Sequence, residues 1–203
     1  MNPQHNVITD AGPTASDTPR PAPAGPAGHL HPIPHEEHVM RPASNMPTDQ
    51  ARTHLLAAID LAARARQHGN HPFGALLTDA AGNVLLTAEN TVITEHDATG
   101  HAETNLVREA SRTMTPDQLA EATLYTSTEP CAMCSGAIYW SGIRRVVYAL
   151  AATELNVLAG VDPEEPLLDL PCRQIFEAGG NTVEVSGPYL YQEAAAVHLG
   201  YWG

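Results

Sequence analysis

Lysine is missing from this sequence, and all ten of its basic residues are arginine. With 23 acidic residues the formal net charge is −13, and residues 48–203 alone hold 8 arginines against 19 acidic residues, a net charge of −11. Proteins that bind the phosphate backbone of nucleic acids normally carry a basic patch. The composition therefore argues against a polynucleotide substrate. The alternative is a local basic patch, for example at Arg144 and Arg145, that could still bind phosphates.

Cysteine and long apolar runs are also scarce. The chain has three cysteines, too few for a disulfide framework once two of them serve the motif described below, so we expect a reducing, cytoplasmic compartment. It has no run of about 18 apolar residues that would span a membrane. The first 30 residues lack a basic segment followed by an apolar core, so no signal peptide is expected.

Proline and histidine are concentrated at the N-terminus. Residues 1–47 hold ten of the 17 prolines and five of the 11 histidines. Such a segment cannot hold a helix or a sheet ladder, and we predict a disordered or extended tail. Its histidines suggest a second metal site, but nothing local would preorganise them, so a solvated tail is favoured. Residues 48–203 are long enough to bury the core of one domain.

The hydrophobic pattern after residue 47 predicts helices alternating with strands. Thr48 is a plausible N-cap. The helix that follows has an apolar stripe at Leu55, Leu56, Ile59, Ala62 and Ala63 and ends at a glycine. A hairpin is predicted from runs at 73–78 and 84–88. The further predictions are a helix opening near 101, a polar connection at 116–121, a strand at 122–126, a helix at 131–140, a strand at 145–150, a helical turn at 153–159, a strand at 182–185 and a terminal helix at 189–199. This order indicates an α/β domain, a sheet sandwiched by helices.

Two short motifs carry the chemistry. His101 and Glu103 form an H-x-E motif, and Cys131 and Cys134 lie in a P-C-x-x-C motif. One imidazole and two thiolates make three zinc ligands and leave the fourth tetrahedral position open, whereas structural zinc sites are normally closed by four protein ligands. The remaining cysteine, Cys172, cannot complete a four-cysteine site. Water at an open position has its pKa lowered to about 7. A redox pair of cysteines is the alternative, but it would not explain the H-x-E motif.

These four groups converge if the starts of the two predicted helices face each other. Cys131 and Cys134 lie three residues apart in the first turn of one helix, which puts both thiolates on one face. His101 and Glu103 lie in the first turn of another helix. The partial positive charge of a helix N-terminus favours thiolates over thiols. Glu103 is not needed as a ligand, so it can take a proton from the water and pass it on.

At these motifs the chain resembles the cytidine deaminase superfamily, and most of all its small bacterial guanine deaminases. The resemblance rests on the segments 72–75, 89–92, 101–103 and 125–140. It implies a three-layer α/β/α fold with a central mixed five-stranded sheet flanked by helices, and one Zn²⁺ per chain. It also implies hydrolytic deamination of a free purine-type base, guanine to xanthine being favoured, by a homodimer. In this resemblance His101, Cys131 and Cys134 match the zinc ligands, and Glu103 matches the proton shuttle.

The resemblance also suggests residues that contact the substrate. Asn90 matches an asparagine whose amide hydrogen-bonds the base, although an asparagine after a strand is commonly a turn residue. Phe73 matches an aromatic that packs on the ring, and Asp162 a second carboxylate near the purine. Tyr201 lies in a terminal aromatic segment that such enzymes exchange between two subunits to close the site; packing on its own helix is the alternative.

Several other functions are compatible with the sequence. The loop 96–100 departs from the family pattern, and Ala98 and Gly100 are expected to loosen the rim of the pocket. The substrate is therefore less secure than the zinc chemistry: a nucleoside, a pterin, an s-triazine or adenosine in transfer RNA are alternatives. A protein of another class, an inactive zinc-stabilised binding protein, is disfavoured by the presence of Glu103.

Overall fold

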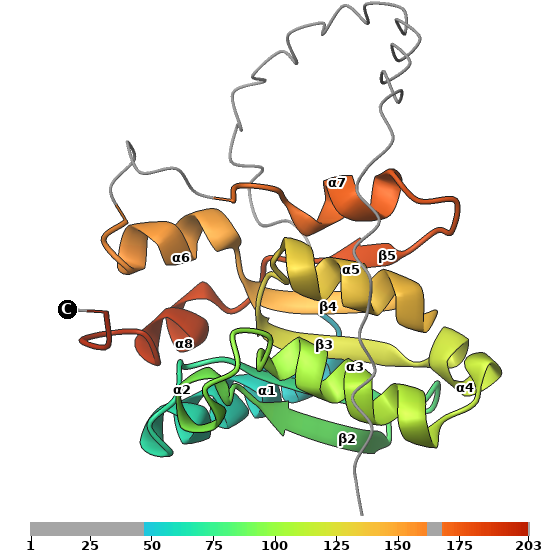
Figure 1. Cartoon of the computed structure of the whole chain (residues 1–203), viewed down its shortest axis with the longest axis horizontal. Coiled ribbons are helices and arrows are strands. Elements are labelled where there is room, and N and C mark those ends of the chain that lie inside the picture. The colour runs from blue at the N-terminus through green and yellow to red at the C-terminus, as the bar shows by residue number, and fades with distance from the viewer. Residues whose placement is uncertain (1–46, 162–167, 203) are drawn as a thin grey trace, which may run out of the picture. The chain divides into compact units, whose positions relative to one another are not determined.

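The computed structural model describes residues 47–161 and 168–202. Within these ranges one mixed five-stranded sheet is covered by helices on both faces (Figure 1), which confirms the predicted three-layer α/β/α fold. The strands are β1 (Gly74–Thr78), β2 (Val84–Glu89), β3 (Thr123–Thr128), β4 (Arg145–Leu150) and β5 (Glu184–Ser186). The helices are α1 (Asp49–Gln67), α2 (Val92–Glu95), α3 (Ala102–Thr113), α4 (Pro116–Glu121), α5 (Ala132–Ser141), α6 (Ala152–Leu158), α7 (Cys172–Glu177) and α8 (Tyr191–Ala196).

The strand order is β2-β1-β3-β4-β5. The hairpin makes β1 antiparallel to β2, and β1 is also antiparallel to β3. The pairs β3–β4 and β4–β5 are parallel, because α5 connects the first pair and α6 and α7 lie between the second, and parallel strands need such crossover connections. The carboxyl end of β3 therefore leads directly into the segment that carries Cys131.

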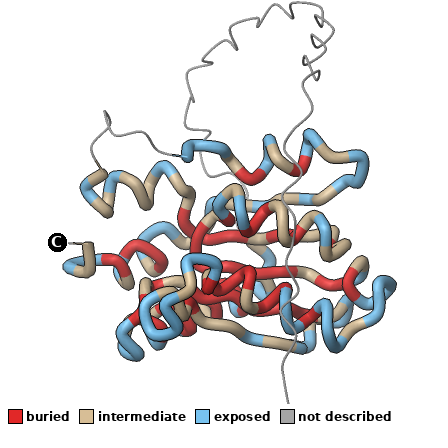
Figure 2. Tube along the Cα trace, viewed as in Figure 1, coloured by how far each residue is buried: buried red, intermediate tan, exposed pale blue. Residues whose placement is uncertain are grey.

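Each face of the sheet has its own apolar core. On one face α1 and α8 pack over residues that include Leu76 and Tyr125. On the other face α3, α5 and α7 pack over residues that include Leu77 and Leu124. Neighbouring residues of one strand point to opposite faces, so Leu76 and Leu77 divide between the two cores. Buried residues follow the sheet and the inner sides of the helices (Figure 2).

Helix α1 begins and ends as the sequence predicts. The Thr48 hydroxyl accepts a hydrogen bond from the backbone N–H of Ala51 and caps the first turn. Gly69 follows the helix with a φ of +87°, in the left-handed region that favours glycine. Of the predicted stripe, Leu55, Ile59 and Ala62 are buried and the other two residues are half-buried.

Four short helices differ from the sequence prediction. The polar connection 116–121 is helix α4, which Thr115 and Gln118 begin with a capping box. Helices α2 and α7 were not predicted, because 4 and 6 residues are too few to show a helical period. The terminal helix α8 is shorter than the predicted 189–199, because the chain after it turns back toward the start of β1.

Some predictions fall outside the described residues. These are the N-terminal tail up to residue 46 and the candidate substrate residue Asp162, and both stay predictions. None of the helices in the described ranges combines the length and the apolar character that crossing a membrane requires.

Candidate active site

The three predicted metal ligands meet where two helices begin. His101 immediately precedes α3, Cys131 immediately precedes α5, and Cys134 lies in the first turn of α5. Helices α3 and α5 pack against each other on the same face of the sheet (Figure 1). As a result, the ligand atoms of the three residues all lie within 4.8 Å of one another.

The spacing of these atoms fits one zinc ion. The Nδ1 atom of His101 lies 3.6 Å from the Sγ of Cys131 and 3.5 Å from the Sγ of Cys134. With ordinary Zn–N and Zn–S bond lengths, tetrahedral coordination places nitrogen and sulfur ligands about 3.6 Å apart. The geometry and the donor set therefore fit one zinc per chain, with three protein ligands.

The charges of the two thiols also suit a cation. Hydrogen bonds from Cys134 and His101 lower the pKa of Cys131 to about 4 and so favour its thiolate. The pKa of Cys134 is raised, because its thiol donates to Cys131 and is buried. The hydrogen bond to Cys131 also raises the pKa of His101. Cys134 therefore becomes a thiolate only when a cation lies beside it. A bound metal ion would supply that positive charge.

Glu103 lies beside this cluster and is almost completely buried, with 5% of its surface exposed. One carboxylate oxygen, Oε1, accepts a hydrogen bond of 3.0 Å from the hydroxyl of Thr126. The other oxygen, Oε2, is 3.6 Å from the Sγ of Cys134. Burial raises the pKa of Glu103 above its ordinary value. A carboxyl group whose pKa moves toward neutrality is suited to taking up and releasing protons.

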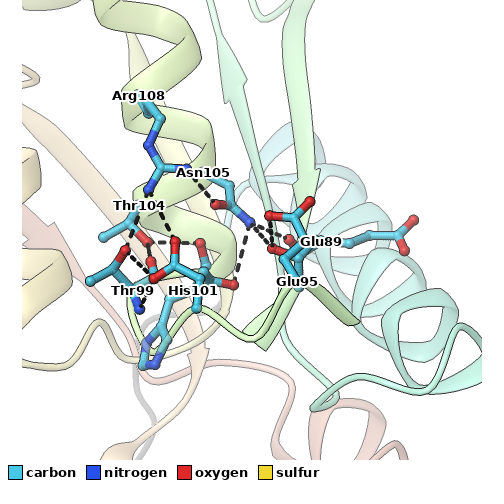
Figure 3. A network of polar contacts seen from close by, with 10 residues as sticks. Glu89, Glu95, Thr99, His101, Thr104, Asn105 and Arg108 are labelled. Carbon is cyan, nitrogen blue, oxygen red and sulfur yellow. Dashed lines mark hydrogen bonds and ion pairs between the residues drawn. The ribbon is translucent and has the colours of Figure 1, made fainter. Parts of the chain in front are cut away.

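A polar network anchors the start of α3 (Figure 3). The side-chain amide of Asn105 donates to the carbonyl of Glu89 at 3.0 Å and to the hydroxyl of Thr91 at 3.0 Å. Arg108 in turn donates to the Oδ1 of Asn105 at 3.2 Å. Because Glu89 ends β2, this network fixes the beginning of α3, and with it His101, to the edge of the sheet.

The loop before His101 is tightly held, contrary to the expectation that Gly100 would loosen it. Asp97 accepts hydrogen bonds from the backbone and the hydroxyl of Thr99 at 2.8 and 2.7 Å. Thr104 donates to the carbonyl of Thr99. A Cβ atom at Gly100 would lie 2.8 Å from the Oγ1 of Thr91. Glycine is required at this position because the loop packs closely against Thr91, and this packing holds the loop before His101 in place.

The segment that carries Cys131 is anchored by Glu129. Its two carboxylate oxygens accept hydrogen bonds of 3.2 Å from the backbone N–H groups of Ala152 and Cys172, at the first residues of α6 and α7. Its own N–H donates to the carbonyl of Leu150 at 2.8 Å. The side chain of Glu129 thus connects the segment that carries Cys131 to the first residues of α6 and α7.

Asn90 makes the contact expected of a turn residue, and its amide nitrogen is buried. Its Oδ1 accepts a hydrogen bond of 3.1 Å from the N–H of Val92, as a turn residue would. Its Nδ2 is buried and has no hydrogen-bond partner among residues 47–161 and 168–202. A buried donor without a partner is costly, so this amide is available to a polar group of a ligand. Phe73, also proposed from the sequence, lies half-buried just before β1.

The C-terminal aromatic residues pack beside this site within their own chain. The Tyr201 hydroxyl is 2.9 Å from the Nδ1 of His71. The Trp202 ring stacks on the rings of His71 and His198, with centroids 5.5 and 6.0 Å apart, and lies 6.1 Å from Phe73. Burial lowers the pKa of His71, and the nearby charge of His101 lowers it further. Exchange of this segment between subunits stays a prediction.

Arg66 fastens the C-terminal segment to α1. Its NH1 donates to the carbonyls of Val197 and Leu199, both at 2.9 Å, and its NH2 donates to that of Gly200 at 3.4 Å. The guanidinium also lies 5.6 Å from the centroid of the Tyr201 ring, a cation–π distance. The sequence contained no signal for this contact, because the partners are backbone carbonyls far along the chain.

We expect Arg66→Ala to release the aromatic segment from α1, because hydrogen bonds from a charged donor contribute about 1.5–3 kcal/mol. Trp202 should then become exposed and its fluorescence shift to longer wavelength. Arg52→Ala is the matched control, since Arg52 also joins α1 to α8, through Glu193 at 3.2 Å. Equal spectral shifts in both variants would contradict a specific role for Arg66.

Three ligands with room for a fourth, and a free carboxylate beside them, define a site for zinc-assisted hydrolysis. Comparison with known proteins shows to which family a protein with this site belongs. Residues 48–150 match the family described as the cytidine and deoxycytidylate deaminase zinc-binding region. The chain is 45% identical over 149 residues to a probable cytosine deaminase of Schizosaccharomyces pombe, an alignment that covers 73% of this chain and 90% of that protein. The chain therefore belongs to the cytidine and deoxycytidylate deaminase family.

Two further relatives differ in their substrates. The guanine deaminase of Bacillus subtilis is 40% identical over 103 residues, which cover 50% of this chain and 65% of that protein. A structure from a study of A-to-I editing by tRNA:A34 deaminases superposes with a TM-score of 0.56 at 27% identity, covering 72% of this chain and 99% of that one. Membership of the family thus establishes a deaminase and leaves its substrate to be assigned.

Proposed function

We propose that this protein hydrolyses the exocyclic amino group of a free nucleobase and releases ammonia. The observation that carries the proposal is the buried carboxylate of Glu103, whose Oε2 lies 3.6 Å from the Sγ of Cys134. A zinc site that only stabilised the fold would have no use for an acid–base group there. This argues against an inactive zinc-stabilised binding protein.

The residues of the site supply the proton transfers of such a reaction. A zinc ion held by His101, Cys131 and Cys134 would lower the pKa of a bound water to about 7 and so supply the nucleophile at neutral pH. Glu103 takes the proton that this water loses and delivers it to the ring nitrogen beside the attacked carbon. The same carboxylate then takes the second proton, from the hydroxyl group that water has added to the carbon, and delivers it to the departing amine, so that the C–N bond breaks and ammonia leaves; a raised pKa suits this role.

Two residues orient the base in this proposal. The Nδ2 of Asn90, buried and without a partner in the described part of the chain, donates to an acceptor on the ring. Phe73 packs against the face of the ring, next to the Tyr201 and Trp202 segment, where Tyr201 closes the pocket. Asp162 keeps its proposed role as a second carboxylate near the base.

Cytosine is the first candidate substrate. The support is the Schizosaccharomyces pombe relative, of which this chain covers 90%. Guanine, favoured by the resemblance in the sequence, is the second candidate, supported by the Bacillus subtilis relative. Transfer RNA is less suited, because the net charge of residues 48–203 is −11 and would repel phosphates.

Ammonia release from a panel of substrates tests this assignment. The panel holds cytosine, guanine, adenine, cytidine, guanosine and transfer RNA. We expect kcat/KM for cytosine to exceed that for guanine at least about 10-fold, because sites that hydrogen-bond one ring strongly reject rings lacking the matching groups. Faster turnover of guanine would reverse the two candidates. Faster turnover of a nucleoside or of transfer RNA than of any free base would contradict the proposal.

We also propose that the protein acts as a cytoplasmic homodimer. Trp140, at the end of α5, is 85% exposed, and aromatic residues are enriched at protein interfaces relative to the rest of the surface. The chain mass is 21.6 kDa, and light scattering that returned only this mass would contradict the dimer. A reducing compartment fits the two thiolate ligands, which must remain reduced to bind metal.

A further inference from the structure

We infer that Thr126 is a positioning residue, one that holds the Glu103 carboxylate so that its proton-carrying oxygen faces the metal ligands. The inference rests on the proposed function, because it concerns the group that moves protons in that reaction. It assigns a role to a side chain that lies outside both sequence motifs.

The contact between Thr126 and Glu103 is buried. Thr126 lies on the central strand β3 with 0% of its surface exposed. Its Oγ1 is 3.0 Å from the Oε1 of Glu103 and 3.5 Å from the carbonyl oxygen of Gly74. A hydroxyl has one proton to donate. The carboxylate is the closer acceptor, and an ionised acceptor makes the stronger bond, so the proton of Thr126 is directed at Glu103.

This bond makes the two oxygens of Glu103 different. Oε1 accepts the hydrogen bond from Thr126, and protonation of Oε1 would weaken that bond, because the hydroxyl oxygen of a carboxylic acid is a poorer acceptor than its carbonyl oxygen. Oε2 lies on the side of the ligand cluster, 3.6 Å from the Sγ of Cys134. When Glu103 takes a proton from water, the proton therefore resides on Oε2, the oxygen from which it can be passed to the substrate. Without the threonine hydroxyl the protonated carboxyl group could turn and hold its proton on the buried side.

Strand β3, which carries Thr126, is closely packed against its neighbours. Gly74 begins β1, next to β3, and its N–H donates to the hydroxyl of Ser127 at 3.2 Å. A Cβ atom at Gly74 would approach backbone atoms of α1 at Ala58 and Ala62 to 2.5 Å, so β1, β3 and α1 are packed without spare room. Because this packing fixes the position of Thr126, its hydroxyl can hold the Glu103 carboxylate in one orientation at little entropic cost during the reaction.

Thr126→Val, which removes the hydroxyl and keeps the shape, tests the inference. With cytosine and guanine as probes, we expect kcat to fall about 10- to 100-fold and KM to stay within about 3-fold, because a hydrogen bond to a charged acceptor is lost. Thr126→Ser should restore kcat to within about 3-fold of the wild type. Thr123→Val is the matched control on the same strand: it loses a bond of 3.1 Å to Arg145 and should keep wild-type kcat. Zinc content and melting temperature are measured for each variant.

Three kinetic outcomes would overturn the inference. They are wild-type kcat in Thr126→Val, a loss that serine does not rescue, and an equal loss in Thr123→Val. If the wild type turns over neither base, the proposed function fails separately, and crystal structures of the wild type and Thr126→Val then decide about Thr126. A Glu103 carboxylate that rotates in the variant supports the positioning role, and one that keeps its orientation overturns it.

Discussion

Replacing Glu103 with alanine should lower the rate of ammonia release by about 10²- to 10⁴-fold while zinc stays bound. This is the contribution that a well-placed general acid–base group makes. In the proposed mechanism Glu103 serves twice, first for the water proton and then for the leaving amine, so we expect a loss in the upper part of that range. Zinc should remain because its three ligands, His101, Cys131 and Cys134, are unchanged.

The control for this variant is Glu109→Ala. Glu109 lies on the same helix, α3, and is exposed, so its removal tests for a general effect of losing an acidic side chain. Ammonia release, zinc content by mass spectrometry and melting temperature are measured together. A Glu103→Ala protein that retained more than about a tenth of wild-type activity would remove the proton shuttle from the mechanism.

Replacing Cys134 with serine should abolish zinc binding and activity together. Cys134 is fully buried in the first turn of α5, where its thiolate completes the ligand set. Loss of residues that merely support metal ligands costs about 10- to 100-fold in activity or affinity. We therefore expect the loss of a ligand to exceed about 100-fold in activity. The melting temperature should also fall, because an ion that binds only the folded state stabilises it.

Cys172→Ala is the matched control for the ligand variant. Cys172 is also fully buried, but it lies at the start of α7, away from the ligand cluster. It should lose some stability through packing and keep its zinc. A Cys134→Ser protein with one zinc per chain and wild-type activity would show that the ion binds elsewhere.

The sequence predicts the parts of this molecule that depend on local patterns. The helix start at Thr48 follows from a capping residue, and the helix starts near His101 and Cys131 follow from the apolar residues after them. Once those starts are known, the spacing of Cys131 and Cys134 places two thiols on one face. The ligand cluster was therefore predictable before any distance was known.

The sequence does not predict contacts between distant segments. The bond from Thr126 to Glu103 requires β3 to lie beneath the first turn of α3, which only the strand order determines. Arg66 reaches the carbonyls after α8 across the interface of two helices. Asn105 gives no local sign that it will join α3 to β2. Nothing in the local sequence around these residues distinguishes them from other residues of their helices and strands. Their roles arise only when tertiary packing brings distant segments together.

The most direct test of the central claim is deamination of cytosine in ¹⁸O-labelled water by the zinc-loaded protein. Hydrolysis with water as the nucleophile predicts a uracil product that carries one ¹⁸O atom at the carbon that lost its amine, with one ammonia released per uracil. The Glu103→Ala protein should give almost none of this product. Unlabelled product, or no ammonia from cytosine or guanine by a fully zinc-loaded wild type, would contradict the account.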